Sequence, residues 1–230
     1  MSRNFTETRI GFIIVIFLIA LSIVSAGAPV LKISKTNTIA NILSTANDNT
    51  ADYWFQKGDE FFGKASYDLA ERCYDKAIEI DPLIAEAWYS KGLALDRQAK
   101  YDEAIKAFDR AIEMNPKYTK AWYSEGVAFY SQRKYDEAIE AYNRTLNIDP
   151  QYAEAWYNKG VILGIRGKQE EAIKCYDNAI DINPLHVGAW NNKGIILKSL
   201  GRTTEADAAF AKAKELEDKV NHSSLELELI

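Results

Sequence analysis

Apolar and polar residues follow two different patterns along this chain of 230 residues. From Ile10 to Leu31 no charged residue occurs, and the apolar run carries no polar stripe. From residue 51 onward, apolar and small residues return at the same places every 34 residues. The first pattern predicts a segment that meets lipid, at least transiently, and the second predicts repeated copies of one structural unit.

Five series of residues keep the period of 34. Tryptophan takes place 4 of each unit, at Trp54, Trp88, Trp122, Trp156 and Trp190. Glycine takes place 8, at Gly58, Gly92, Gly126, Gly160 and Gly194. Alanine takes place 20, at Ala70, Ala104, Ala138, Ala172 and Ala206, and an aromatic residue takes place 24, at Tyr74, Phe108, Tyr142, Tyr176 and Phe210. Proline takes place 32 in four units, at Pro82, Pro116, Pro150 and Pro184, and Asp218 stands there in the fifth. The units are therefore 51–84, 85–118, 119–152, 153–186 and 187–220.

The pattern within each unit predicts a pair of antiparallel helices. In the second unit Trp88, Gly92 and Leu95 share one helix face over residues 85–98. A matching stripe over residues 101–114 consists of Ala104, Phe108 and Ala111. The glycine lets the two helices approach closely. A lone pair cannot bury both of its faces, so the pattern predicts a stack of pairs.

The turn between the two helices and the end of the second helix also have sequence signals. Asp102 is a plausible N-cap of the second helix, with Glu103 in its first turn. An Asn-Pro or Asp-Pro pair then stops that helix, because proline cannot continue it and restricts the residue before it.

This pattern resembles that of the tetratricopeptide repeat family, W-x2-L-G-x2-Y…A-x3-F…P over 34 residues. The resemblance covers residues 51–220. The chain departs from the family pattern at the leucine position, place 7 of each unit, which holds Lys57, Lys91, Glu125, Lys159 and Lys193. The resemblance implies an all-α fold, a right-handed superhelical solenoid of five helix pairs, with a concave groove in which partners bind.

The charged residue at place 7 falls between the helix-pairing stripe and the flank that meets the preceding repeat. A lysine there predicts a stem packed along the seam with its ammonium in water. The third unit reverses the sign at three places together, at Lys120, Glu125 and Glu140. The joint reversal indicates charge matching between neighbouring repeats, so that Glu125→Lys is expected to lower stability.

Places 5, 9 and 12 fall on the flank that lines the groove in the tetratricopeptide family. They hold Phe55, Tyr89, Tyr123, Tyr157 and Asn191 at place 5, Leu93, Val127, Val161 and Ile195 at place 9, and Tyr130 at place 12. This set predicts a tyrosine ladder above an aliphatic floor, suited to a peptide or protein partner. The other interpretation is that the tyrosines only pack against neighbouring helices.

Both ends of the array carry polar residues where inner repeats are apolar. Glu60 marks the first unit, and Asp207 and Lys214 mark the fifth, so terminal capping repeats and no sixth unit are expected. Residues 221–230 fit no repeat and are predicted to be a flexible tail. The two cysteines share place 23 in units one and four, too far apart for a disulfide.

The amino-terminal segment, residues 1–31, has two interpretations. The apolar run 10–31 is long enough for a signal anchor that stays as a single transmembrane helix. It also fits a signal peptide cleaved near Ala26, which would give a secreted protein. Residues 32–50 are rich in Ser, Thr and Asn and predict a polar linker. We expect the repeats to lie outside the cytoplasm, because export signals of this shape usually leave the carboxyl side outside.

Composition narrows the function further. The net charge of −5 argues against a nucleic-acid partner. Two histidines and two cysteines assemble no metal site or catalytic pair, and no glycine-rich phosphate loop occurs, so neither enzyme activity nor a cofactor is expected. We predict a membrane-tethered scaffold that binds a peptide or protein partner in the groove. A self-association module, or the interaction subunit of an enzyme complex, is the alternative.

Overall fold

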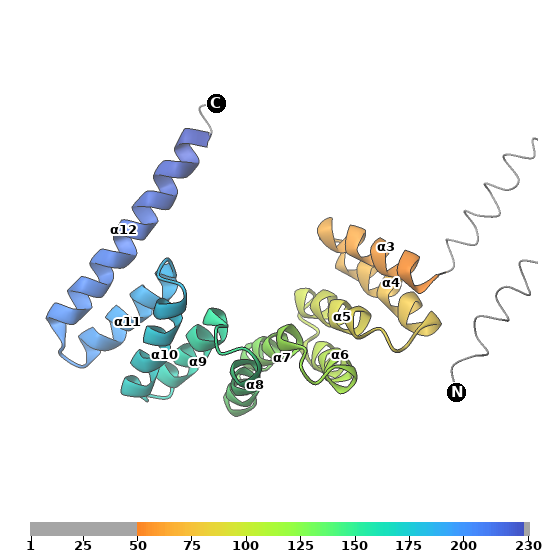
Figure 1. Ribbon diagram of the computed structural model, residues 1–230, viewed down its shortest axis with the longest axis horizontal. Helices are drawn as coiled ribbons and strands as arrows, with labels where there is room; N and C mark the ends of the chain where they lie inside the picture. Colours follow the sequence, from red (N-terminus) through yellow and green to blue (C-terminus); the bar gives the residue numbers. More distant parts are fainter. Residues whose placement is uncertain (1–49, 228–230) are drawn as a thin grey trace, which may run out of the picture. The chain divides into compact units, whose positions relative to one another are not determined.

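The computed structural model describes residues 50–227 as ten helices, and those residues contain no strand (Figure 1). The helices are α3 (Ala51–Gly63), α4 (Tyr67–Ile80), α5 (Ala85–Arg97), α6 (Tyr101–Met114), α7 (Thr119–Ser131), α8 (Tyr135–Ile148), α9 (Ala153–Ile165), α10 (Gln169–Ile182), α11 (Val187–Ser199) and α12 (Thr203–Leu227). The expected membrane segment 1–31 and the linker up to residue 49 lie outside the described residues. Among α3 to α12, none has the length and apolarity to cross a bilayer.

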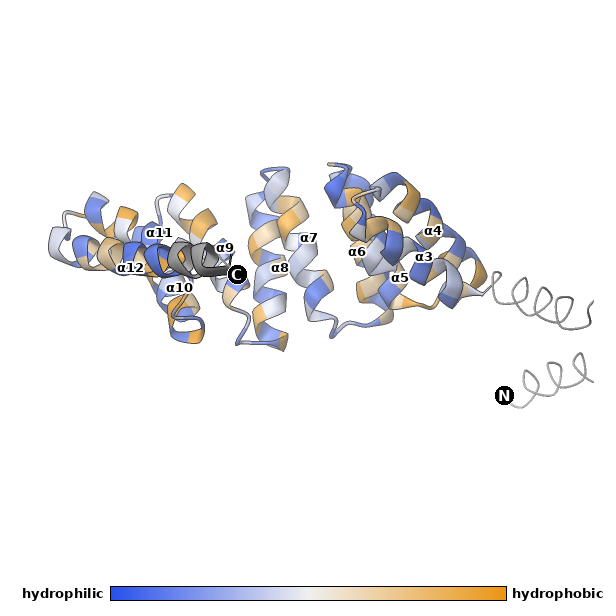
Figure 2. Cartoon of the chain, turned by 90° about the horizontal axis from the view of Figure 1, so that it is seen from above, coloured by the Kyte–Doolittle hydropathy of each residue, from blue (hydrophilic) through white to orange (hydrophobic). Residues whose placement is uncertain are grey.

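The helices form five pairs. Each odd-numbered helix packs mainly on the helix that follows it, and each pair packs on the next. In the second repeat the expected helices 85–98 and 101–114 are observed as Ala85–Arg97 and Tyr101–Met114. Every labelled helix in Figure 2 carries both hydrophobic and hydrophilic residues, as expected for helices that are covered on one side and solvated on the other.

Within a pair, the two helices meet where a glycine faces an aromatic ring. A β-carbon on Gly92 would lie 2.4 Å from the ring of Phe108, and one on Gly126 would lie 2.6 Å from the ring of Tyr142. The remaining pairs are Gly58 with Tyr74, Gly160 with Tyr176 and Gly194 with Phe210. Phe108 and Tyr142 are fully buried. The glycine therefore creates the space that the ring fills.

Between pairs, the tryptophan of repeats two to five binds the loop that precedes it. The indole Nε1–H of Trp88 donates to the carbonyl oxygen of Pro82 across 3.0 Å. The same bond joins Trp122 to Pro116, Trp156 to Pro150 and Trp190 to Pro184, at 3.0 to 3.1 Å. Proline therefore ends one repeat and supplies the acceptor that positions the next.

The turn inside each repeat uses a left-handed backbone at place 15. The residues there are Ala65, Ala99, Arg133, Gly167 and Gly201, with φ between 55° and 76°. In the second repeat the N–H of Lys100 then reaches the carbonyl oxygen of Leu95 at 3.0 Å, which closes the end of α5. The expected capping role of Asp102 was wrong, because α6 already begins at Tyr101 and places Asp102 inside its first turn.

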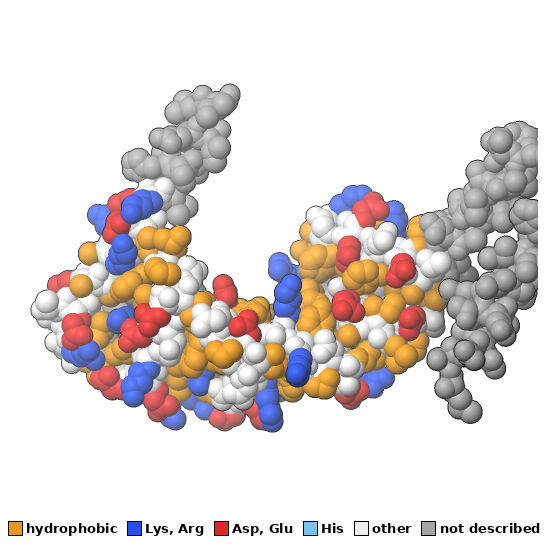
Figure 3. All heavy atoms as spheres, viewed as in Figure 1, with side chains coloured by type: hydrophobic (Ala, Val, Ile, Leu, Met, Phe, Trp, Pro, Cys, Tyr) orange, Lys and Arg blue, Asp and Glu red, His pale blue; other side chains and the backbone are white. Residues whose placement is uncertain are grey.

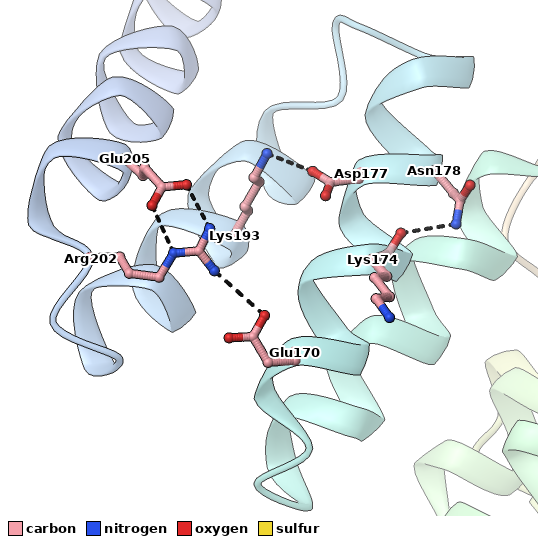
Figure 4. Close-up of polar contacts among 7 residues, drawn as sticks. All are labelled: Glu170, Lys174, Asp177, Asn178, Lys193, Arg202 and Glu205. Carbon is pink, nitrogen blue, oxygen red and sulfur yellow. Dashed lines mark hydrogen bonds and ion pairs between the residues drawn. The ribbon is translucent and has the colours of Figure 1, made fainter.

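The lysines at place 7 lie along the seams, as predicted, and their ammonium groups find partners there. The Nζ atom of Lys193 lies 2.5 Å from the carboxylate of Asp177, which Figure 4 shows at the seam between repeats four and five. The equivalent partners are Asp75 for Lys91, at 2.6 Å, and Asn143 for Lys159, at 2.7 Å. In Figure 4, Arg202 also joins Glu170 of the preceding repeat to Glu205 of its own.

The third repeat breaks this rule, and the expected charge matching at Glu125 was wrong. Burial, and then the neighbouring Asp109 of the second repeat, raise the pKa of its carboxyl group. The acidic partner at place 25 is therefore kept while the lysine at place 7 is replaced by an acid. Glu125→Lys would restore the pair seen at other seams, so it is expected to raise stability instead of lowering it.

The two ends of the array differ from its middle as the sequence predicted. Glu60, Asp207 and Lys214 are exposed, whereas place 28 of the inner seams is buried at Ile78, Ile112, Leu146 and Ile180. Helix α12 continues to Leu227, through most of the segment expected to be a tail. No proline stops it, since the fifth repeat has Asp218 at place 32.

Gly92→Ala is expected to lower the free energy of unfolding by about 1–3 kcal/mol, because the new methyl group must displace the ring of Phe108. Gly63→Ala is the matched control, since a β-carbon there has no neighbouring atom within 4 Å. Urea unfolding followed by circular dichroism measures both variants. Equal stability of the two would show that the glycine does not set the distance between the helices.

Candidate functional site

The predicted groove lies along the first helices of the repeats. Figure 3 shows the described repeats curving around a hollow, and in Figure 1 helices α5 and α7 lie closer to it than α6 and α8. Tyr89, Tyr123 and Tyr157 are half-buried, and so are Leu93, Val127 and Val161. Ile195 is 56% exposed. The aliphatic floor is therefore most open in the fifth repeat.

Each tyrosine of the ladder packs on the aromatic ring that faces the glycine of its own repeat. The ring centroids of Tyr123 and Tyr142 are 5.9 Å apart, and those of Tyr157 and Tyr176 are 6.1 Å apart. Tyr89 lies 6.0 Å from Phe108, and Phe55 lies 5.8 Å from Tyr74. Through these contacts the ladder rests on the same rings that hold each helix pair together.

A second aromatic series completes the ladder at place 34, the last residue of a repeat. Tyr118 lies 4.9 Å from Tyr89, and Tyr152 lies 4.9 Å from Tyr123, between ring centroids. His186 takes this place beside Tyr157, at 4.5 Å, and its Nδ1 also accepts the backbone N–H of Ala189 at the start of α11. Sequence analysis missed this series, although its recurrence every 34 residues at the repeat boundary was a visible signal.

Two ladder hydroxyls are held by the next repeat. Asn158 Nδ2 donates to the hydroxyl of Tyr123 across 3.0 Å, and Asn192 Nδ2 donates to that of Tyr157 across 3.2 Å. Burial raises the pKa of the Tyr123 phenol, so it stays neutral at physiological pH. Because both phenols accept these bonds, each keeps its own O–H to donate to a ligand.

At both ends of the array, polar residues on the groove flank bond within their own repeat. In the first repeat Asp59, at a floor place, accepts the hydroxyl of Tyr74 at 2.8 Å. In the fifth repeat Asn191 donates to Glu217 of α12 at 3.3 Å. Tyr130, from place 12, packs 5.9 Å from Tyr135. The predicted residues therefore form a continuous ladder only from Tyr89 to Tyr157.

Two buried polar atoms of this region have no hydrogen-bond partner. They are Oδ1 of Asp96, at place 12 of the second repeat, and the hydroxyl of Tyr142, whose ring packs under Tyr123. Burial raises the pKa of Asp96, with a smaller opposing effect of Arg97.

A hollow of about 410 Å³ lies between α5 and α6, away from the ladder, and its lining includes Trp88, Lys91 and Arg110. Two of its cations already have partners, since Lys91 pairs with Asp75 and Arg110 with Glu113. Residues 50–219 bring no three His, Cys, Asp or Glu side chains together as a metal site. Both cysteines are free and buried.

Models of the tetratricopeptide repeat family match residues 55–118 and 91–153, residues 153–185 and residues 175–208. A crystal structure of MamA is 27% identical in sequence, with a TM-score of 0.68 over 72% of this chain and 96% of that one. MamA from Desulfovibrio magneticus RS-1, residues 41 to the end, is 21% identical, with a TM-score of 0.68 over 74% and 96%. YrrB, a TPR protein with an unusual peptide-binding site, is 20% identical, with a TM-score of 0.63 over 83% and 97%. None of the curated proteins compared with the chain matches it.

Tyr123→Phe is expected to lower the free energy of unfolding by about 1 kcal/mol, because Asn158 loses its acceptor across the seam. Tyr89→Phe is the matched control, since the described residues offer the Tyr89 hydroxyl no hydrogen-bond partner. Denaturant unfolding at neutral pH measures the difference. The same loss in both variants would mean that the Asn158 bond does not tie the repeats together.

Proposed function

Because the chain belongs to the tetratricopeptide repeat family, we propose that it is a non-enzymatic scaffold that binds an extended peptide or a protein partner along the groove of its first helices. The observation that carries the proposal is the composition of that surface: half-exposed tyrosines with O–H groups free to donate, beside an aliphatic row that ends in the exposed Ile195. Tyrosine combines a rigid apolar face with a polar tip, which suits contact with peptide side chains and carbonyl groups.

The groove tyrosines serve the fold as well as the surface. Replacing them with alanine would remove the packing on Tyr142 and Tyr176 and the bonds from Asn158 and Asn192. A test of binding therefore needs a side chain whose loss leaves the seams intact. Ile195 meets this requirement, because more than half of its surface faces solvent.

Ile195→Asn is expected to weaken peptide binding roughly tenfold, which corresponds to losing an apolar contact of about 1.4 kcal/mol. The probe is a display library of random linear peptides, selected on the wild-type chain, and the affinity of the selected peptides is measured by fluorescence anisotropy. Ile80→Asn is the matched control, since Ile80 is 46% exposed on α4, a second helix.

Unchanged affinity in the Ile195 variant, or an equal loss in the Ile80 variant, would contradict the groove as the binding surface. Failure to select any peptide, together with concentration-dependent sedimentation of the wild-type chain, would favour the self-association module instead.

We also propose that residues 10–31 tether the repeats to a membrane, with the repeats on the extracytoplasmic side. The support is the uncharged apolar run of 22 residues, which at about 1.5 Å per residue is long enough for a hydrocarbon core of about 30 Å. Protease added to intact cells should remove residues 51–230, and the amino terminus of the mature protein should begin before Ile10. A mature terminus near Ala28 would show cleavage and secretion, and protection from protease would place the repeats inside.

A further inference from the structure

The seam between the second and third repeats is built differently from its neighbours. At the seams on either side, a lysine at place 7 meets an acid or an amide at place 25 of the preceding repeat. The distances are 2.6 Å for Lys91 and Asp75, 2.7 Å for Lys159 and Asn143, and 2.5 Å for Lys193 and Asp177. The second seam instead joins α6 to α7 through two acids, Asp109 and Glu125.

Glu125 is buried next to a second acid. It is only 5% exposed, and Asp109 takes place 25 opposite it, the place from which Asp75 and Asp177 reach the lysines of their seams. Asp109 itself lies at the surface. A buried carboxyl group that faces another acid and has no cation as a partner favours its protonated form, so Glu125 holds a proton.

The charged groups around Glu125 do not neutralise a second charge. Glu140 faces it from α8, 3.8 Å from Arg144. On α5, Lys91 is bonded to Asp75, and on α6, Arg110 is paired with Glu113. Within residues 50–219 no ion pair joins either member of the acid pair to a cation. Burial, and then the neighbouring acids Asp109 and Glu140, raise the pKa of Glu125 to about 9.

We propose that the acid pair of Glu125 and Asp109 makes the seam between repeats two and three a proton-controlled joint. With the proton in place, α6 and α7 dock as at any other seam. When the proton leaves, Glu125 carries a buried negative charge beside a second acid, and the seam opens while the lysine seams on either side stay closed. The inference rests on this seam alone and does not depend on the groove being a binding surface.

The direction of the pH dependence follows from the raised pKa. Between the ordinary pKa of 4.5 and the folded value of about 9, the folded chain holds a proton that the unfolded chain has released. The stability from this group is fully present below about pH 4.5, falls as the pH rises through the window, and is lost above about pH 9.

The experiment compares urea unfolding of the full chain in detergent micelles at about pH 6 and about pH 8, for the wild type and Glu125→Gln. Glutamine matches the protonated acid in shape and can donate to Asp109. For each pH unit, the folding equilibrium constant of the wild type is expected to fall by a factor roughly ten times larger than that of the variant. An equal pH slope in the two proteins would overturn the proposal.

One further variant and one further measurement locate the effect. Lys193→Gln removes one partner from a seam that has no acid pair, so this variant should keep the pH slope of the wild type. A changed slope would count against Glu125 as the group responsible for the pH dependence. Trypsin cleavage after Lys117, in the loop between α6 and α7, should be slower at about pH 8 in Glu125→Gln than in the wild type. Equal cleavage rates would show that this seam does not open.

Discussion

The contact between the glycine at place 8 and the ring at place 24 is the interaction on which the rest of the array depends. It fixes how closely the two helices of a repeat approach, and the fully buried rings of Phe108 and Tyr142 leave no room for a β-carbon at Gly92 and Gly126. The same rings support the groove tyrosines on their other side. Helix pairing and groove geometry are therefore set by one contact, repeated five times.

Much of this fold could be predicted from the sequence because each repeat buries the same residues at the same places. The series of Trp54 and Gly58 fixes the first helix, and the proline at place 32 fixes the loop. The geometry of the turn inside each repeat was harder to predict from the sequence. Asp102 looked like a cap, but a left-handed residue at Ala99 starts α6 earlier, and alanine does not mark such a residue as glycine does at Gly167.

The groove and the seams depend on partners that the sequence alone does not identify. The sequence left open whether the tyrosine ladder is a binding surface or only packs against neighbouring helices, and it did not show that Asn158 of the next repeat, 35 residues away, holds Tyr123. The negative charge of Glu125 set it apart from the lysines at place 7, and the sequence suggested neighbours at places 2 and 22. In the folded chain its neighbour is instead Asp109, at place 25 of the preceding repeat. Such contacts follow from the angle between repeats, which a linear pattern does not contain.

The left-handed residue at place 15 has a consequence for the order in which the array comes apart. A β-carbon in this conformation costs on the order of 1 kcal/mol, and only Gly167 and Gly201 avoid it. The first three repeats bear that local cost, and the last two do not. In a solenoid whose repeats are stabilised one neighbour at a time, intrinsic stability then rises toward the carboxyl end. Fraying would begin at the amino-terminal repeats, nearest the expected membrane segment, while the last two repeats stay folded.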